Sequence, residues 1–165
     1  MKDILETNRL LLNELTTNDF EFIFELVNTQ EWIQFIGNRN IETYEDAKAY
    51  IQKIKENSDI QYWTVTLKEE KKLIGVITFI KRDYLDNSDI GFAFLPNFTK
   101  KGYAYEATKA VLNRVTKNDS HKRILATTLK ENQNSIRLLE KLGLEFDKVI
   151  KVEDEELLLF AMEAN

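Results

Sequence analysis

Residues that interrupt regular backbone are scarce in this chain. Glycine occurs five times and proline once in 165 residues, although these two residues mark most turns and loops. Collagen-like and low-complexity chains are therefore excluded, as are all-β designs that need a turn every few residues. Hydrophobic residues make up 43% of the chain and charged residues 31%, which is enough apolar material for a packed core. We expect long helices and strands in one domain covering residues 1–165.

Charge and side-chain inventory exclude several functional classes. The net charge of −5 disfavours nucleic acid as a partner, because phosphate binding needs a basic field. There is no cysteine and only one histidine, so disulfides, cysteine nucleophiles and a transition-metal site are not expected. The longest apolar run, Leu157 to Met162, is far shorter than the roughly 18 residues of a membrane span. The N-terminus has acids among its apolar residues and no signal-peptide core, so we expect a soluble cytoplasmic protein, as a monomer or a homodimer, with no membrane partner.

The spacing of hydrophobic residues changes along the chain between helical and strand periods. Helical spacing of three and four follows capping residues such as Thr16 and Thr43, and alternation begins at Ile60. Three successive segments with short polar connections predict an antiparallel meander. The predicted elements are a strand over 4–15, a helix over 20–27, an irregular aromatic segment over 32–40, a helix over 43–54, strands over 60–67, 73–80 and 88–95, a helix over 104–118, a strand over 124–129, a helix over 135–142, and strands over 146–152 and 157–162.

One segment with chemical information is Phe92 to Ala104, which reads as a strand, a proline stop, a turn and a helix start. Backbone N–H groups at a helix N-terminus bind anions, and small residues let a phosphate approach the main chain. Lys100 and Lys101 add positive charge to this turn, and Gly102 and Ala104 are small. Local pattern alone is equally typical of an ordinary exposed turn with solvated lysines.

A second segment runs from Leu129 to Leu144 and reads as a strand end, a polar turn and a short helix that ends at Gly143. Asn132 and Ser135 precede or open this helix, where such side chains usually cap free N–H groups. On its own the segment therefore indicates a capped helix and no particular chemistry.

Three motifs together resemble the GNAT superfamily of acyl-CoA-dependent N-acetyltransferases, in its Rim-type branch of ribosomal-protein N-terminal acetyltransferases. The segment Leu5 to Leu12 (LETNRLLL), followed by Leu15 and Asp19, resembles that branch's first strand and helix start. Residues 96–107 (PNFTKKGYAYEA) resemble its pyrophosphate loop, and residues 132–144 (NQNSIRLLEKLGL) resemble its motif after the next strand. The motifs occur in the family's order and span almost the whole chain.

The resemblance implies a mixed α/β GNAT fold: a seven-stranded, mostly antiparallel sheet with two splayed central strands and about four helices. It also implies acetyl-CoA as the cofactor, with coenzyme A as product. The pantetheine arm would pair with the open edge of a strand at Phe94 and Leu95, and Asn132 would hold the arm. The pyrophosphate would lie on the turn and first residues of the helix predicted over 104–118: Lys100, Lys101, Gly102, Tyr103, Ala104 and Tyr105.

For catalysis, the resemblance directs attention to Ser135 and Asp89. Leu139 stands where many family members have a tyrosine acid, so Ser135, one helical turn earlier, becomes the candidate donor to the leaving sulfur. Asp89 stands where related enzymes often carry a glutamate, which makes it the candidate general base, directly or through water. Its alternative reading is a solvated loop carboxylate.

The acceptor must be a neutral amine before it attacks the thioester. Deprotonation at pH 7 costs about 4.6 kcal/mol for a lysine-like amine but only about 1 kcal/mol for a peptide α-amine. The aromatic segment that contains Trp32 and Phe35 would wall the acceptor site in this branch. We therefore expect acetyl transfer to a peptide N-terminus or a small-molecule amine by direct attack. The alternative is a catalytically weak GNAT-like module that binds CoA or a protein partner.

Overall fold

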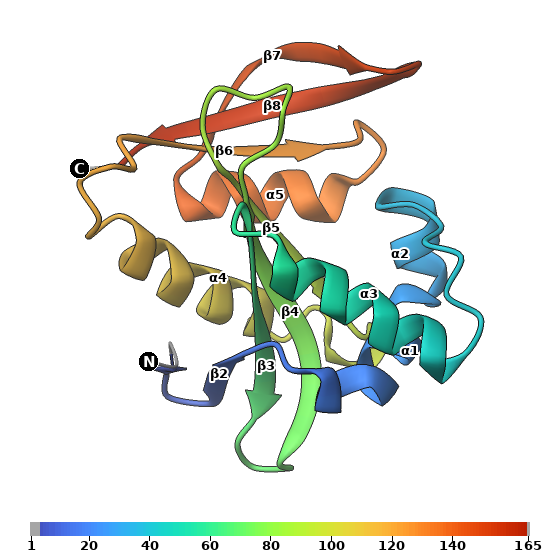
Figure 1. Ribbon diagram of the computed structural model, residues 1–165. Helices are drawn as coiled ribbons and strands as arrows, with labels where there is room; N and C mark the ends of the chain where they lie inside the picture. Colours follow the sequence, from blue (N-terminus) through green and yellow to red (C-terminus); the bar gives the residue numbers. More distant parts are fainter. Residues whose placement is uncertain (1–3, 165) are drawn as a thin grey trace.

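The computed structural model describes residues 4–164, so residues 1–3 and 165 of the predicted domain lie outside the described part. Its centre is an eight-stranded sheet in the order β1-β2-β3-β4-β5-β6-β8-β7 (Figure 1). The strands are β1 (Leu5–Glu6), β2 (Leu10–Glu14), β3 (Ile60–Leu67), β4 (Lys72–Ile80), β5 (Asp89–Phe94), β6 (Arg123–Thr128), β7 (Glu145–Val152) and β8 (Glu155–Glu163). The α-helices are α1 (Phe20–Val27), α2 (Gln30–Phe35), α3 (Tyr44–Glu56), α4 (Tyr103–Val115) and α5 (Gln133–Leu142).

The mixed, mostly antiparallel sheet is confirmed, but the predicted count of seven strands is wrong. The segment expected as one strand over 4–15 forms two strands, β1 and β2, which pair antiparallel with Leu5 opposite Leu12. The backbone N–H of Thr7 donates to the carbonyl of Leu10 at 2.9 Å, and this tight turn divides the segment. Apolar content alone did not reveal the turn, because no glycine or proline marks it.

The aromatic segment predicted to be irregular contains helix α2, so the described chain has five α-helices rather than about four. Thr29 caps α2: its side chain accepts the backbone N–H of Trp32 at 3.2 Å. The helix ends before Gly37, which has a φ of 128°. A six-residue helix makes fewer than two turns, which is too few to show a repeating amphipathic pattern, and the segment was therefore predicted to be irregular.

The meander β3-β4-β5 forms the middle of the sheet, as predicted, with Tyr62 opposite Thr78 and Ile77 opposite Phe92. Successive residues 62–65 of β3 and 74–79 of β4 are all buried. Since alternate side chains point to opposite faces, both faces of the central strands are covered. Helix α3 packs on β3 and on α1, whereas α4 packs on β5 and on α5.

The two neighbouring strands β5 and β6 run parallel and separate soon after they meet. The pair Asp89 and Leu125 is the single register pair between them within residues 4–164, and the N–H of Leu125 also donates to Ser88 at 3.1 Å. Beyond this vertex the edge of β5 that faces β6 has no ladder partner in the described chain. The expected splay of two central strands is therefore present, and its open end lies at the carboxyl ends of β5 and β6.

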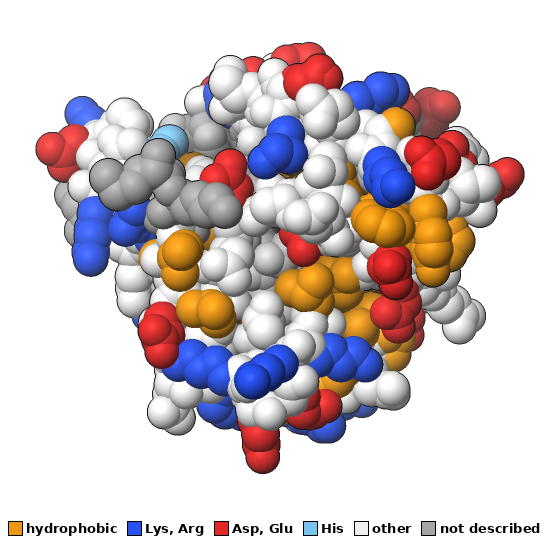
Figure 2. Space-filling model, turned by 60° about the horizontal axis from the view of Figure 1, so that its bottom comes forward, with side chains coloured by type: hydrophobic (Ala, Val, Ile, Leu, Met, Phe, Trp, Pro, Cys, Tyr) orange, Lys and Arg blue, Asp and Glu red, His pale blue; other side chains and the backbone are white. Residues whose placement is uncertain are grey.

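No helix within residues 4–164 combines the length and apolarity that a membrane span requires. Figure 2 shows one face of the molecule, where lysine and arginine side chains form a short band with aspartate and glutamate around it. Basic charge on this face is therefore local, despite the net negative charge of the chain.

Candidate active site

The turn before α4 forms a nest of backbone donors. Lys100 and Gly102 both have left-handed backbone, with φ of 62° and 84°, and Gly102 is the N-cap of α4. None of the N–H groups of residues 100–105 donates to an acceptor within the described chain. Such a turn aims successive N–H groups at one point, and the helix dipole adds to their positive potential. The turn therefore has the geometry that anion binding would require, within the part of the chain that the structure describes.

The parallel course of β5 and β6 brings the two motif segments to the same end of the sheet. Helix α4 follows β5 through the short 3₁₀ turn Pro96–Phe98, and α5 follows β6 directly. The starts of both helices consequently lie at the open end of the splay, and α4 and α5 pack against each other. Segments 100–105 and 132–135, about 30 residues apart in sequence, thus flank one gap.

Asn132 and Ser135 open helix α5. The side-chain oxygen of Asn132 accepts the backbone N–H of Ser135 at 3.2 Å, so Asn132 is the helix cap that local pattern predicted. The Ser135 hydroxyl is half-buried and makes no hydrogen bond within residues 4–164. A free hydroxyl and the amide nitrogen of Asn132 therefore remain for a ligand.

Phe94 and Leu95 have buried side chains. The Phe94 ring covers Gly75 on β4, and the N–H of Leu95 donates to Ile74 at 2.9 Å. Their side chains belong to the core, so what β5 offers toward β6 at this point is main chain. The backbone role of Phe94 in cofactor binding stays a prediction.

Asp89 lies at the vertex of the splay and is 3% exposed, so the reading as a solvated loop carboxylate is wrong. Its carboxylate accepts a hydrogen bond from the Nε of Arg82 at 2.7 Å. Burial raises the pKa of the Asp89 carboxyl above its ordinary value, and the Arg82 guanidinium opposes part of that rise. A buried carboxylate with a raised pKa is better suited to accept a proton near neutral pH than a solvated one.

Trp32 and Phe35 both lie on α2. Trp32 is buried, and its indole N–H has no acceptor among the described residues. Phe35 is half-buried. Since buried indole N–H groups usually find a partner, Trp32 is the member of this pair with unused hydrogen-bonding capacity.

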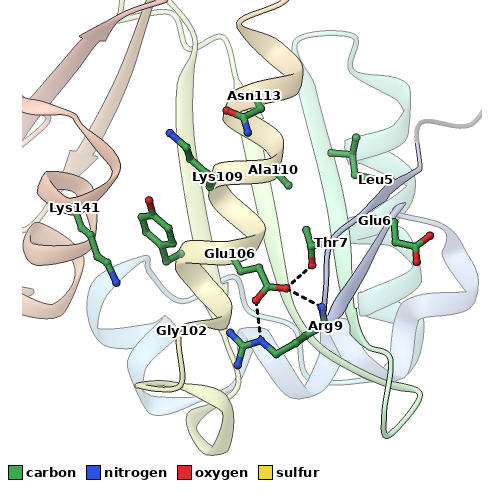
Figure 3. A pocket seen from close by; sticks show the side chains of 11 residues that line it. Leu5, Glu6, Thr7, Arg9, Gly102, Glu106, Lys109, Ala110, Asn113 and Lys141 are labelled. Carbon is green, nitrogen blue, oxygen red and sulfur yellow. Dashed lines mark hydrogen bonds and ion pairs between the residues drawn. The ribbon is translucent and has the colours of Figure 1, made fainter.

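A hollow of about 660 Å³ adjoins the loop, between the N-terminal strand and the helices α4 and α5. Arg9, Gly102, Tyr105, Lys109 and Lys141 contribute to its lining. The Nζ of Lys141 lies 4.6 Å from the centre of the Tyr105 ring. Figure 3 shows Lys109 on α4 and Lys141 on α5 at one side of the hollow, with Leu5 and Glu6 at the other. The lining therefore combines an aromatic ring, three cationic side chains and the carboxylates of Glu6 and Glu106.

The sequence analysis missed two arginines next to predicted site residues. Arg82 had a usable signal: β4 and β5 form a hairpin in which Ile80 is opposite Asp89, so a residue just past Ile80 must lie near Asp89. Arg9 lies in the first quoted motif, but nothing there indicated its contact with Glu106, which is 97 residues away. Only the folded chain brings these two together.

The splayed sheet, the donor nest at the start of α4 and the capped start of α5 across the gap define the class of acyl-transferring enzymes with an anion-binding strand–loop–helix. The model of the acetyltransferase (GNAT) domain matches residues 9–145. The chain belongs to the GNAT acetyltransferase family, and it is an N-acetyltransferase by that membership.

Individual proteins agree with this assignment. The chain is 35% identical over 140 residues to the uncharacterized N-acetyltransferase YnaD of Bacillus subtilis (strain 168), a match that covers 85% of this chain and 81% of YnaD. The crystal structure of a GNAT-family acetyltransferase from Bacillus anthracis superposes with a TM-score of 0.82 at 28% identity, covering 98% and 99% of the two chains. RimL, a ribosomal L7/L12 α-N-protein acetyltransferase solved with coenzyme A, shares the fold with a TM-score of 0.84 at 12% identity over 98% of both chains.

Proposed function

We propose that this protein transfers an acetyl group from acetyl-CoA to a primary amine, either a peptide N-terminus or a small molecule. The observation that carries the proposal is the run of unpaired N–H groups from Lys100 to Tyr105 at the start of α4. These donors would hold the coenzyme's diphosphate, and the nearby lysines would add charge complementarity. The hollow beside Tyr105 and Lys141 suits the nucleotide end of the coenzyme.

The pantetheine arm would follow the open edge of β5 from the loop toward Asp89. An extended strand of six residues such as β5 spans roughly 20 Å, comparable to an extended pantetheine arm. The main chain at Phe94 and the amide of Asn132 would hold the arm by hydrogen bonds. The acyl end then reaches into the gap between β5 and β6.

The proposed reaction is a direct attack without a covalent enzyme intermediate. Asp89 takes a proton from the incoming ammonium group, directly or through water, and the neutral nitrogen attacks the thioester carbonyl carbon. The C–N bond forms and the C–S bond breaks, so the sulfur leaves as the CoA thiolate. The second proton of the attacking nitrogen passes through water to that thiolate, which gives the amide and the CoA thiol. Ser135 donates a hydrogen bond to this sulfur, supported by the N-terminus of α5. Trp32 and Phe35 on α2 would wall the acceptor side.

Coenzyme binding and turnover test this proposal together. A ligand that binds only the native state raises the unfolding midpoint, so CoA at 100 times its Kd should stabilise the protein by about 2.7 kcal/mol. Acetyl-CoA with an amine panel of N-terminal peptides, polyamines, amino acids and aminoglycosides should release thiol, and mass spectrometry should show an acetylated product. No binding of CoA by calorimetry would overturn the proposal. Binding without thiol release from any amine would instead favour the non-catalytic module.

Changing Ser135 to alanine separates two possible contacts of its hydroxyl. If the hydroxyl meets the developing thiolate, kcat should fall about tenfold with little change in the KM for acetyl-CoA. Steady-state kinetics on both substrates give the answer, with Ser135→Thr as the variant that keeps a donor. A raised KM with unchanged kcat would remove Ser135 from the chemical step and assign it to the pantetheine arm.

A further inference from the structure

Glu106, in the first turn of α4, is held by the N-terminal segment of the chain. Its carboxylate accepts hydrogen bonds from the Thr7 hydroxyl at 2.5 Å, from the Arg9 backbone N–H at 2.9 Å and from the Arg9 Nε at 2.8 Å (Figure 3). Burial alone would raise the pKa of Glu106, but these hydrogen bonds and the charge of Arg9 outweigh it, so the pKa is lowered. Glu106 is therefore held as a carboxylate, on the side of α4 that faces Thr7 and Arg9.

Arg9 also contacts the donor nest itself. Its Nη1 donates to the carbonyl of Lys101 at 3.1 Å, and its guanidinium lies 4.4 Å from the centre of the Tyr103 ring. A Cβ at Gly102 would lie 3.2 Å from the Nη2 of Arg9. One side chain therefore touches the residues on both sides of Gly102 and leaves little space at Gly102.

The Lys101 contact fixes the direction of a donor in the nest. The carbonyl of Lys101 and the N–H of Gly102 belong to one planar trans peptide unit, so they point in opposite directions. Because Arg9 binds the carbonyl, the Gly102 N–H points away from Arg9. The left-handed conformation of Gly102 has no side-chain cap to stabilise it, so Arg9 supplies this constraint.

Arg9 also controls a charge conflict. A carboxylate in the first turn of α4 stands at the same helix end that would receive a dianionic diphosphate, and like charges there repel. A carboxylate that was free to rotate could itself accept hydrogen bonds from the N–H groups of the nest, as acidic side chains do at helix N-termini. Arg9 neutralises Glu106 and, with Thr7, occupies its carboxylate oxygens with hydrogen bonds.

We propose that Arg9 is a positioning residue that keeps the 100–105 loop in its anion-binding shape and keeps Glu106 from competing with the coenzyme's diphosphate. This inference rests on the proposed function of the loop. Thr7 assists by donating a hydrogen bond to the Glu106 Oε2, while the Arg9 Nε binds Oε1. Lysine cannot replace Arg9, because an ammonium lacks the planar fork that reaches Glu106 and Lys101 together.

The test measures CoA binding by calorimetry and acetyl-CoA kinetics in Arg9→Gln and Arg9→Lys. Both variants should weaken CoA binding and raise the KM for acetyl-CoA about tenfold, with kcat nearly unchanged. Adding Glu106→Gln to Arg9→Gln should restore part of the affinity, because the uncompensated carboxylate is then gone. Glu106→Gln alone should change affinity less than Arg9→Gln does.

Arg123→Gln is the matched control. Arg123 forms an ion pair with Asp147 at 2.9 Å, and its side chain is 39% exposed, close to the 41% of Arg9. The Arg123→Gln variant should bind CoA with wild-type affinity. Its thermal stability should fall by a small amount, similar to the loss in Arg9→Gln. If the Arg9 variants bind CoA as the wild type does, or if Glu106→Gln fails to rescue Arg9→Gln, the positioning role is overturned. If the wild type itself binds no CoA, the proposed function fails instead. Should Arg9→Gln not fold, Arg9→Lys still distinguishes these results.

Discussion

Asp89→Asn is expected to lower kcat by about 100-fold or more, because a positioned general base contributes factors of this size. In the wild type, kcat/KM should fall as the pH drops through the raised pKa of Asp89, since only the carboxylate accepts a proton. The acid limb of the pH–rate profile should therefore lie at a higher pH than the pKa of an ordinary aspartate would give. Initial rates of thiol release across pH, with saturating acetyl-CoA, provide the measurement.

The stability of the Asp89→Asn variant should stay close to that of the wild type, which keeps the kinetic result interpretable. A carboxyl whose pKa is raised by folding binds its proton more tightly in the native state, so its ionisation at neutral pH opposes folding. Asparagine removes that cost, and the Arg82 left behind reaches solvent, with 36% of its side chain exposed. Asp86→Asn, which changes an exposed carboxylate in the loop before β5, is the control and should retain full activity. Wild-type kcat in Asp89→Asn would exclude Asp89 as the base.

Arg82→Gln should shift the acid limb of the same pH–rate profile to still higher pH. The guanidinium of Arg82 opposes the burial that raises the pKa of Asp89, so its removal leaves burial unopposed. An upward shift of the limb in Arg82→Gln, measured by the same thiol-release assay, would identify Asp89 as the titrating group. An unchanged limb would assign the titration to another residue or to the acceptor amine.

Gly75→Ala is expected to lower the free energy of unfolding by about 3 kcal/mol, at the upper end for an added methyl group in a packed core. The new Cβ would lie 2.5 Å from the Phe94 ring and 2.7 Å from the Ala93 carbonyl oxygen. The ring can turn, but the backbone oxygen belongs to the β4–β5 ladder and cannot move alone. Chemical denaturation measures the loss, and CoA affinity should fall with it because the strain falls on the β5 edge.

Gly143→Ala provides the control for Gly75→Ala. Gly143 has a φ of 100° but nothing within 4 Å of an added Cβ, so its substitution costs only the left-handed conformation, about 1 kcal/mol. If Gly75→Ala is no more destabilising than Gly143→Ala, the close approach of β5 to β4 at Phe94 does not constrain the sheet.

Much of the fold was predictable because its signals are local. The alternation from Ile60 to Leu67 and the period-three and period-four spacing before Val115 each predict one element, and the structure confirms both. The stop of α5 at Gly143 was equally readable, since a left-handed glycine ends helices. The missed turn at Thr7 and the missed helix α2 share a cause: each is too short to repeat a hydrophobic pattern, and hydrogen bonds of single threonines define them.

The amino-acid sequence by itself determined the order of the longer helices and strands, the turn with Lys100 and Gly102, and the capped start of α5, because each depends on residues within a few positions of one another. Only the tertiary structure decided that Asp89 is buried against Arg82, that β5 and β6 part just beyond it, and that Arg9 reaches Lys101 and Glu106 across more than 90 residues. Burial and ion pairing depend on which distant segments pack together, and no local sequence pattern specifies those long-range contacts.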